Sequence, residues 1–422
     1  MNTMSGLQEP ALRRLAWALL VGAVMLAMCL SAPALALLGI PYDLPLGPFP
    51  AKIHPATYLL FASYLLGLAS HGNPLAVAVA QFRCHPLLAL SLACMVFVFA
   101  WTAARHGPAG LAFIIDTLWT PAIGALALLL HAPQRQRRLL PLMMGLLALN
   151  AVIAIGEFAL QQRLVPLSAS RGEVVAEAFF RSSALLGHPL LNALVTVALL
   201  PALSLLPWPA RWRWPLYALL ALALLSFGGR ATFVGAAFYL LLAGGGLLHR
   251  VARGDYGYLQ LTGGLLGAML ACSLLAGIVA ASGLGERIFS NFGWDHSAAT
   301  RWHAWELLDY VRGSELWIGI PVSRIDHLAQ RIGIDPRYEA IENFWLYLLL
   351  LFGAIGFVPF VIGIGALAAH LWRSAGAAMR AAVIVYFFVA SGANTLASKS
   401  VSLWLLSVAL HPCRHGPRRA LP

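Results

Sequence analysis

Long apolar stretches recur along this chain from Leu15 to Leu410, and they restrict its fold more than any other feature. A stretch of about 20 apolar residues is long enough to cross the hydrocarbon core of a bilayer as a helix. The 422 residues are 60% hydrophobic and only 10% charged, whereas about 25% of the residues in soluble domains are charged. This composition excludes the soluble, fibrous and disordered classes. It predicts an all-α, polytopic integral membrane protein with a single domain over residues 1–422.

Twelve apolar windows can be marked as membrane spans, which places both ends of the chain on the same side. Residues 1–14 are polar and carry Arg13 and Arg14. The apolar run that follows is too long for a signal-peptide core, so it is predicted to be the first span. The expected spans are residues 15–38, 56–72, 86–104, 110–131, 139–159, 188–206, 215–229, 231–248, 259–281, 343–368, 381–394 and 400–412.

Arginine is unevenly divided between the two ends of these spans. Short cytoplasmic loops of membrane proteins hold an excess of Lys and Arg. One face holds many arginines against only Glu9 and Asp255, so we expect this face and both termini to be cytoplasmic. The net charge of +12 then reflects topology, and no nucleic-acid partner is predicted. The arginines of this face are Arg13, Arg14, Arg83, Arg135, Arg137, Arg138, Arg211, Arg213, Arg250, Arg253, Arg373, Arg380, Arg414, Arg418 and Arg419.

The opposite, extracytoplasmic face carries the only long polar insertion, residues 282–342. Nine of the sixteen acidic residues lie in it, between Glu286 and Glu342. Its aromatic residues and scattered Leu and Ile predict a small folded cap with short helices. A second polar outer loop, residues 160–187, is shorter. The five cysteines form no CxxC motif or Cys/His cluster, so neither a disulfide nor a metal site is predicted.

Two outer elements place arginine where lipid penalises it. The turn Ser226–Thr232 has two glycines before Arg230, whose guanidinium could clamp a phosphate. The alternative is an arginine that snorkels to the lipid headgroups. The segment Arg181–Pro189 would bring Arg181, His188 and the start of a helix close to one anionic group. Alternatively, Arg181 only anchors the helix and His188 is a structural histidine.

A third element, Ser297–Trp305, lies in the large loop and places Arg301 and His303 among tryptophans. Aromatic rings beside a cation suit both sugar and phosphate. An amphipathic helix that lies on the membrane surface would have the same pattern.

The fourth element, Tyr338–Trp345, leads into a long apolar helix. Glu342 would serve there as a general base, as an acceptor that orients a hydroxyl, or as a partner in an ion pair. Asn343 would contact substrate or cap the helix. Asp116 is a further acid within a predicted span, and its position favours orienting a neighbouring polar group over reacting.

The order of these elements resembles the O-antigen ligase and O-antigen polymerase family over about residues 180–360. Two positions differ from the family pattern. Glu342 stands where ligases of the family carry His before the Asn, and Pro321 replaces the second glycine of a Gly-x-Gly turn. The similar features are Arg181–Pro189, Ser226–Thr232, Trp302–Leu308 followed by Leu316–Ile320, and Glu342–Leu346 followed by Phe352–Gly356.

The resemblance implies a glycosyltransferase that needs neither a metal nor another cofactor and that acts at the periplasmic face of the bacterial inner membrane. Its donor would be an undecaprenyl-diphosphate-linked glycan, and its acceptor would be a sugar hydroxyl of a glycan or of lipid A-core. Its other partners would be the lipid bilayer and further proteins of polysaccharide assembly.

The resemblance also implies residue roles. Arg181, Arg230 and Arg301 would bind the diphosphate and stabilise it as the leaving group. Glu342 would accept the proton or align the attacking hydroxyl. Contacts to substrate would come from Arg181, His188, His303 and Asn343. The glutamate favours a polymerase of O-antigen or exopolysaccharide repeats over an O-antigen ligase.

A transporter or flippase of a polar or anionic solute is the competing class. It should carry polar residues at mid-membrane on several helices, and it should show internal repeats. Here no convincing repeat is found, and the polar residues gather at one face and in one loop, with Asp116 and Asn192 as the chief exceptions. A structural scaffold would leave the arginines at the membrane unexplained.

Overall fold

The computed structural model describes residues 5–44, 47–108, 110–167, 179–255, 257–284, 302–334 and 341–411. Over these residues the chain is helical and contains no strand. Six helical stretches are long and apolar enough to cross a membrane, in agreement with a polytopic all-α membrane protein; the number of spans stays a prediction. The six are Ala11–Cys29, Pro86–His106, Leu111–Leu129, Pro133–Leu160, Arg230–Ala252 and Phe344–Ser374.

Proline occupies the first or second position of most helical elements in the described first half of the chain. At the first helical position its missing N–H loses no hydrogen bond, and its fixed φ suits the helix. The helices of this half are α1 (Ser5–Cys29), α2 (Ala32–Leu37), the 3-10 turn η1 (Phe49–Lys52), α3 (Pro55–Ala69), α4 (Pro74–Cys84), α5 (Pro86–His106), α6 (Leu111–Phe113), the π-helical segment η2 (Ile114–Trp119), α7 (Thr120–Leu129) and α8 (Pro133–Leu160).

The second half contains the segments that the sequence singles out. Three short helices, η4, α16 and α17, lie in the predicted cap. The elements are α10 (Pro189–Leu199), the 3-10 helix η3 (Leu200–Leu205), α11 (Ala210–Phe227), α12 (Arg230–Ala252), α13 (Tyr258–Ser282), the 3-10 helix η4 (Ala304–Tyr310), α16 (Gly313–Ile318), α17 (Val322–Arg331), α18 (Phe344–Ser374), α19 (Ala377–Ser391) and α20 (Ser402–Leu410).

Two predicted spans are interrupted in the structure. The first is broken after α1, because the Ser31 side chain caps a separate helix by accepting a hydrogen bond from the Ala34 amide. The span predicted over residues 343–368 changes direction at Gly353, which has non-helical φ and ψ angles of 62° and 173°. Helix α4 lies between the second and third predicted spans and is too short to belong to the six long apolar helices.

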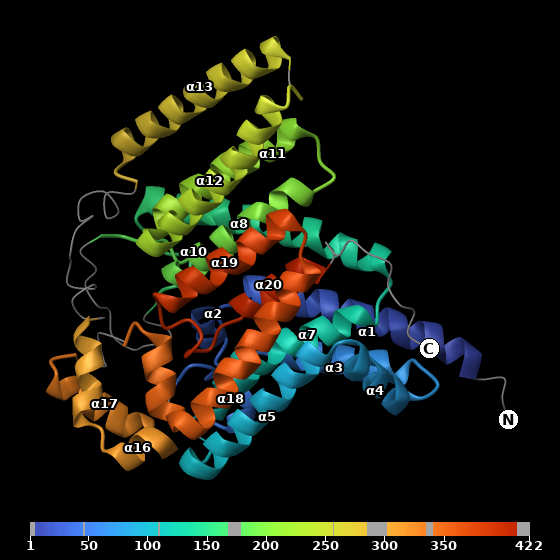
Figure 1. The fold of residues 1–422 in the computed structure, drawn as a ribbon, viewed down its shortest axis with the longest axis vertical. Helices are drawn as coiled ribbons and strands as arrows, with labels where there is room; N and C mark the ends of the chain where they lie inside the picture. Colours follow the sequence, from blue (N-terminus) through green and yellow to red (C-terminus); the bar gives the residue numbers. More distant parts are fainter. Residues whose placement is uncertain are drawn as a thin grey trace.

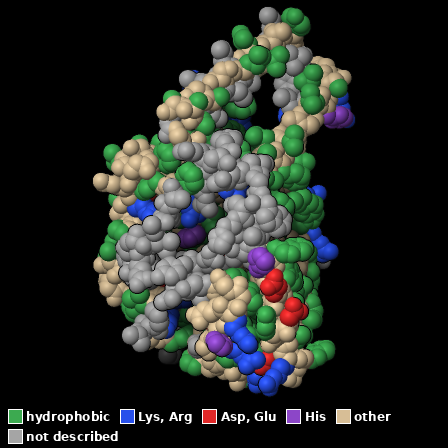
Figure 2. Space-filling model, turned by 90° about the vertical axis from the view of Figure 1, so that its left-hand side faces the viewer, with side chains coloured by type: hydrophobic (Ala, Val, Ile, Leu, Met, Phe, Trp, Pro, Cys, Tyr) green, Lys and Arg blue, Asp and Glu red, His purple; other side chains and the backbone are tan. Residues whose placement is uncertain are grey.

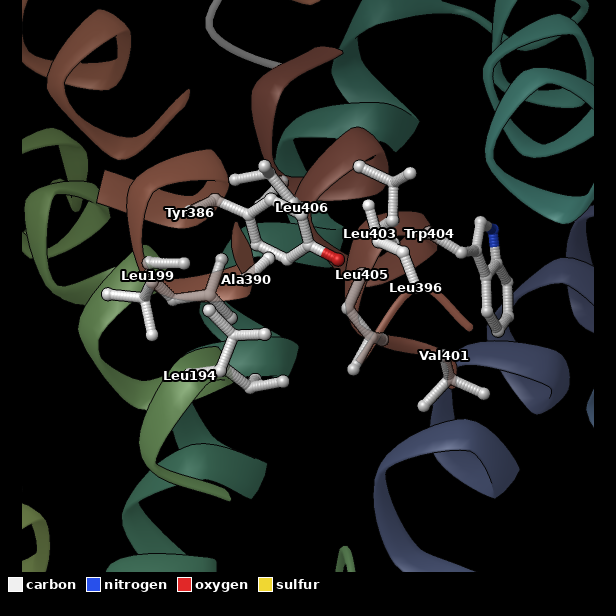
Figure 3. Close-up of a cluster of buried hydrophobic side chains, with 14 of the residues drawn as sticks. Leu194, Leu199, Tyr386, Ala390, Leu396, Val401, Leu403, Trp404, Leu405 and Leu406 are labelled. Atoms are coloured by element: carbon white, nitrogen blue, oxygen red, sulfur yellow. The ribbon is translucent and has the colours of Figure 1, made fainter. Parts of the chain in front are cut away.

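The helices pack side by side in a bundle, with α1 against α3, α5 against α18, α8 against α11 and α12 against α19 (Figure 1). Helix α20 lies at its centre, and every residue of Ser402–Leu410 is buried. Figure 3 shows Leu403 and Leu406 of α20 among Leu194 of α10 and Tyr386 of α19. The short helices α16 and α17 lie at one end of the bundle, beside the first turns of α18 (Figure 1).

Candidate functional site

The segment Arg181–Pro189 is fixed to the bundle by α8. The Glu157 carboxylate, only 4% exposed, accepts hydrogen bonds from the backbone N–H groups of Ser183 and Ala184 at 2.8 and 2.9 Å, and from that of Leu164 at 2.8 Å. The buried Asn150 side chain accepts another from the Leu185 N–H at 2.9 Å. Both α8 residues lie within the predicted span 139–159, and sequence reasoning missed them. The only sign of them in the sequence is that each is a polar residue within an apolar span.

This segment also packs closely on the break between α1 and α2. Ala184 and Gly187 have positive φ angles of 37° and 73°. A Cβ atom at Gly187 would overlap the Ser31 side chain and would lie 2.9 Å from Cδ of Pro33, so only glycine fits. Backbone held in the left-handed region by contacts on two sides is characteristic of functional loops.

Arg181 and His188 mark the two ends of the segment, and both are half-buried. The Arg181 carbonyl accepts hydrogen bonds from the guanidinium of Arg163 at 3.0 and 3.1 Å. His188 is the N-cap residue of α10. The Asn192 side chain reaches back from α10 and donates to the carbonyls of Ser183 and, at 3.0 Å, of His188. Asn192 therefore serves to hold the loop.

The turn with Arg230 adjoins this segment directly. The Ser182 N–H donates to the Ser226 carbonyl at 3.1 Å. Gly228, with a φ of 64°, ends α11, and Arg230 is the first residue of α12. A Cβ atom at Gly229 would lie 3.3 Å from the Ala193 side chain, so the turn also touches α10.

The structure thus brings together two of the four predicted elements, those of Arg181 with His188 and of Arg230. Helices α10 and α12 both begin at this junction, and helix N-termini carry partial positive charge. Arginine side chains and helix N-termini both favour anions, and the segments that carry Arg181 and Arg230 meet here. Figure 2 shows side chains of Lys or Arg and of His near the middle of one face of the molecule.

The other two predicted elements, Ser297–Trp305 and Tyr338–Trp345, lie only partly within the described residues. Arg301 lies outside them. His303 is exposed and pairs with Glu306, with 2.8 Å between Nδ1 and Oε1. Asn343 caps α18, because its side chain accepts a hydrogen bond from the Leu346 N–H at 3.2 Å. Glu342 is half-buried at the entry to α18.

A joint between the cap and α18 lies at the Gly353 break, at the far end of the helical segment that begins after Asn343. Gly319, with a φ of 84°, meets the Gly353 break of α18 so closely that a Cβ atom at either glycine would overlap backbone of the other segment. The helix break frees three carbonyls, and each finds a donor. The Ile320 N–H donates to Leu350 at 2.8 Å, His106 Nε2 lies 2.9 Å from the Leu351 oxygen, and Trp101 Nε1 donates to Phe352 at 2.8 Å.

A second buried polar cluster surrounds Asp116 in the π-helical segment η2. Its carboxylate accepts hydrogen bonds from the Tyr42 hydroxyl at 3.0 Å, the Thr57 hydroxyl at 2.7 Å and the His54 N–H at 3.0 Å. The predicted role of Asp116 as an orienting group agrees with these contacts. The Lys399 ammonium lies 4.4 Å from the centre of the Tyr42 ring and donates to the Tyr42 carbonyl.

The cluster adjoins the Arg181–Pro189 segment through the break after α1. The His54 Nε2 lies 2.7 Å from the Leu30 carbonyl oxygen, and the next residue, Ser31, contacts Gly187. Burial lowers the pKa of His54 and also that of Lys399, while the carboxylates of Asp43 and Asp116 act in the opposite direction on Lys399. Sequence reasoning missed Tyr42, His54 and Lys399, which lie in short connections between apolar runs.

Among the described residues, no group of three or more His, Cys, Asp or Glu side chains could hold a metal ion. The sequence matches no protein-family model and no curated protein.

Proposed function

We propose that this chain is a membrane glycosyltransferase that moves a glycan from undecaprenyl diphosphate to a sugar hydroxyl at the periplasmic face of the bacterial inner membrane. In this proposal it polymerises the repeat units of an O-antigen or exopolysaccharide. The chain crosses the membrane twelve times, with both termini in the cytoplasm and the cap in the periplasm.

The observation that carries the proposal is the hydrogen bond between Ser182 and Ser226, which joins the two arginine elements. A diphosphate is the substrate group that two arginines and two helix N-termini suit best. In the proposed mechanism, Arg181 and Arg230 neutralise the charge that develops on the leaving diphosphate, and Arg301 assists them. His188 and His303 contact the substrate.

The acceptor side of the reaction is assigned to the entry of α18. Glu342 accepts the proton of the attacking hydroxyl or aligns that hydroxyl. Asn343 forms a helix cap that sets the direction of the first turn of α18. The rigid joint at Gly319 and Gly353 supports this assignment, because a catalytic carboxylate must be held in place.

Transfer to lipid A-core by an O-antigen ligase is the nearest alternative, since it uses the same donor and the same leaving group. A transporter of an anionic solute is the second alternative. The hydrogen bonds of Asp116 and Asn192 argue against transport, because both side chains hold backbone or neighbouring side chains of the protein itself.

The test is deletion of the gene followed by complementation with wild type, Arg230→Ala and Glu342→Gln. Surface polysaccharide is read on gels, and lipid-linked intermediates are read by mass spectrometry. We expect the deletion strain to lack long chains while single repeat units remain attached, and we expect neither variant to restore the chains. Arg138→Ala changes an exposed arginine at the start of α8 and should restore them.

Other outcomes separate the alternatives. Long chains that accumulate on the lipid carrier would indicate a ligase. Unchanged glycans in the deletion strain would overturn glycosyl transfer and make transport the leading hypothesis.

A further inference from the structure

Helix η4 of the cap has two faces of opposite character. Ala304 and Leu307 are fully buried and belong to the main hydrophobic core. The exposed side carries Trp305, Glu306 and Asp309 of η4, together with Trp302 just before it. These four residues line one open groove of about 520 Å³, a volume within the range of ligand sites.

The two tryptophans of this groove are exposed even though the core is close by. Trp302 is 68% exposed and Trp305 is 47% exposed. Tryptophan carries one of the largest apolar surfaces of any side chain, and it is usually buried against something. The fold buries the small Ala304 and leaves both indoles exposed beside the carboxylates of Glu306 and Asp309, so apolar and acceptor surfaces lie together here.

Two contacts lie at and beside the groove. The exposed Glu306 carboxylate is oriented by His303, whose Nδ1 lies 2.8 Å from Oε1. At the end of η4 the guanidinium of Arg331 from α17 lies 5.4 Å from the centre of the Tyr310 ring.

The chemistry of the groove selects one class of ligand. Flat indole faces pack against the C–H faces of a pyranose ring, and carboxylates accept hydrogen bonds from its hydroxyls. Two carboxylates repel a phosphate. A surface helix that binds membranes carries Lys and Arg on its polar face, whereas here that position is taken by Glu306 and Asp309.

We propose that the groove formed by Trp302, Trp305, Glu306 and Asp309 is a binding subsite for an uncharged saccharide chain. This inference rests on the proposed function, in which the groove holds glycan that extends away from the diphosphate. The subsite is distinct from the junction of Arg181 and Arg230, which binds the charged end of the donor.

The test measures saccharide binding to the full-length protein in lipid nanodiscs by saturation-transfer NMR and titration calorimetry. The probes are maltohexaose, chitotetraose and size-fractionated surface polysaccharide released from the producing strain. We expect Trp302→Ala and Trp305→Ala each to weaken binding about tenfold or more, as truncation of an anchoring tryptophan does. Trp212→Ala removes an indole that is 63% exposed on α11, and it should leave binding unchanged.

Two outcomes would overturn the subsite. One is that none of the probes binds the wild-type protein. The other is that both tryptophan variants bind as the wild type does. If Trp302→Ala and Trp305→Ala instead lower the yield of protein inserted into nanodiscs while binding is kept, the face is a membrane contact.

The subsite and the proposed function fail in different ways. Arg230→Ala should bind saccharide normally although it cannot transfer it. If Arg230→Ala leaves the cell's polysaccharide unchanged while Trp305→Ala abolishes binding, the transfer reaction is wrong and the saccharide subsite stands.

Discussion

At the scale of single residues, Glu157 organises the loop that presents Arg181. Its carboxylate accepts backbone hydrogen bonds from both ends of the connection between α8 and α10, at Leu164 and at Ser183 and Ala184. A carboxylate has acceptor sites for all of these donors. No neutral side chain of the same shape can replace it fully.

We therefore predict that Glu157→Gln destabilises the protein by about 1–3 kcal/mol, because an amide nitrogen would face a backbone N–H in a buried place. Thermal unfolding of the purified protein in detergent measures this change. Glu306→Gln, at an exposed carboxylate, should change stability by less than about 0.5 kcal/mol. Equal stability of Glu157→Gln and wild type would mean that the carboxylate does not hold the loop.

His54 is a second residue with a defined chemical state. Its Nδ1 accepts the Ala56 N–H at 3.1 Å as the N-cap of α3, so the proton of the neutral ring is on Nε2, which then donates to the Leu30 carbonyl at 2.7 Å. Protonation of Nδ1 would remove this cap acceptor. Burial lowers the pKa of His54 from its ordinary value of 6.5 in the same direction.

The lowered pKa predicts how stability depends on pH. The unfolded chain takes up the proton more readily than the folded chain, so the contribution of His54 is fully present above pH 6.5 and is lost as pH falls toward the lower folded pKa. The unfolding temperature should therefore drop as the pH falls below 6.5. The drop should be smaller in His54→Asn, which keeps a cap acceptor, and unchanged in His249→Asn, whose exposed ring lies on α12.

At the scale of elements, the break in α18 converts one long helix into two segments joined at Gly353. The freed carbonyls are bound by α5 and by the cap, so three elements that are distant in sequence share one joint. This arrangement fixes the cap relative to the entry of α18, where Glu342 lies.

Gly353→Ala should therefore loosen the cap from the bundle. The new methyl group would overlap the backbone of Gly319, and alanine is strained at a φ of 62°. We expect faster limited proteolysis within residues 302–334 and a lower unfolding temperature. Gly365→Ala is the matched control, because a Cβ atom there meets nothing within 4 Å and alanine favours the helix. Equal proteolysis of the two variants would show that the joint does not hold the cap.

At the scale of the whole molecule, the arginine distribution predicts which end of the bundle faces the cytoplasm. Green fluorescent protein fused after Arg253 should fluoresce, since that connection is predicted to be inside. Alkaline phosphatase inserted after Gly333 in the cap should be active, because the enzyme folds outside the cytoplasm. Each reporter is also placed at the other position. A reporter that is active at both Arg253 and Gly333 would exclude the predicted topology.

Periodicity and composition were enough to predict the helical class and most helix positions, such as α5 and α8, since a bilayer imposes both length and apolarity. The sequence indicated Arg181–Pro189 and Ser226–Thr232 as two separate elements, but not that they meet. Glu157 and Lys399 could not be predicted, because their roles depend on the partners that tertiary packing supplies. The breaks at Ser31 and Gly353 also depend on such contacts.

The joint at Gly353 has a consequence for the order in which the chain is made. Residues 302–334 leave the ribosome before α18, so the cap is made before the helix on which it docks. The Ile320 N–H donates to the carbonyl of Leu350, which belongs to the later helix α18. The contact between Gly319 and Gly353 therefore forms only after α18 is made, and a chain that ends before residue 353 has the junction of Arg181 and Arg230 but lacks this joint.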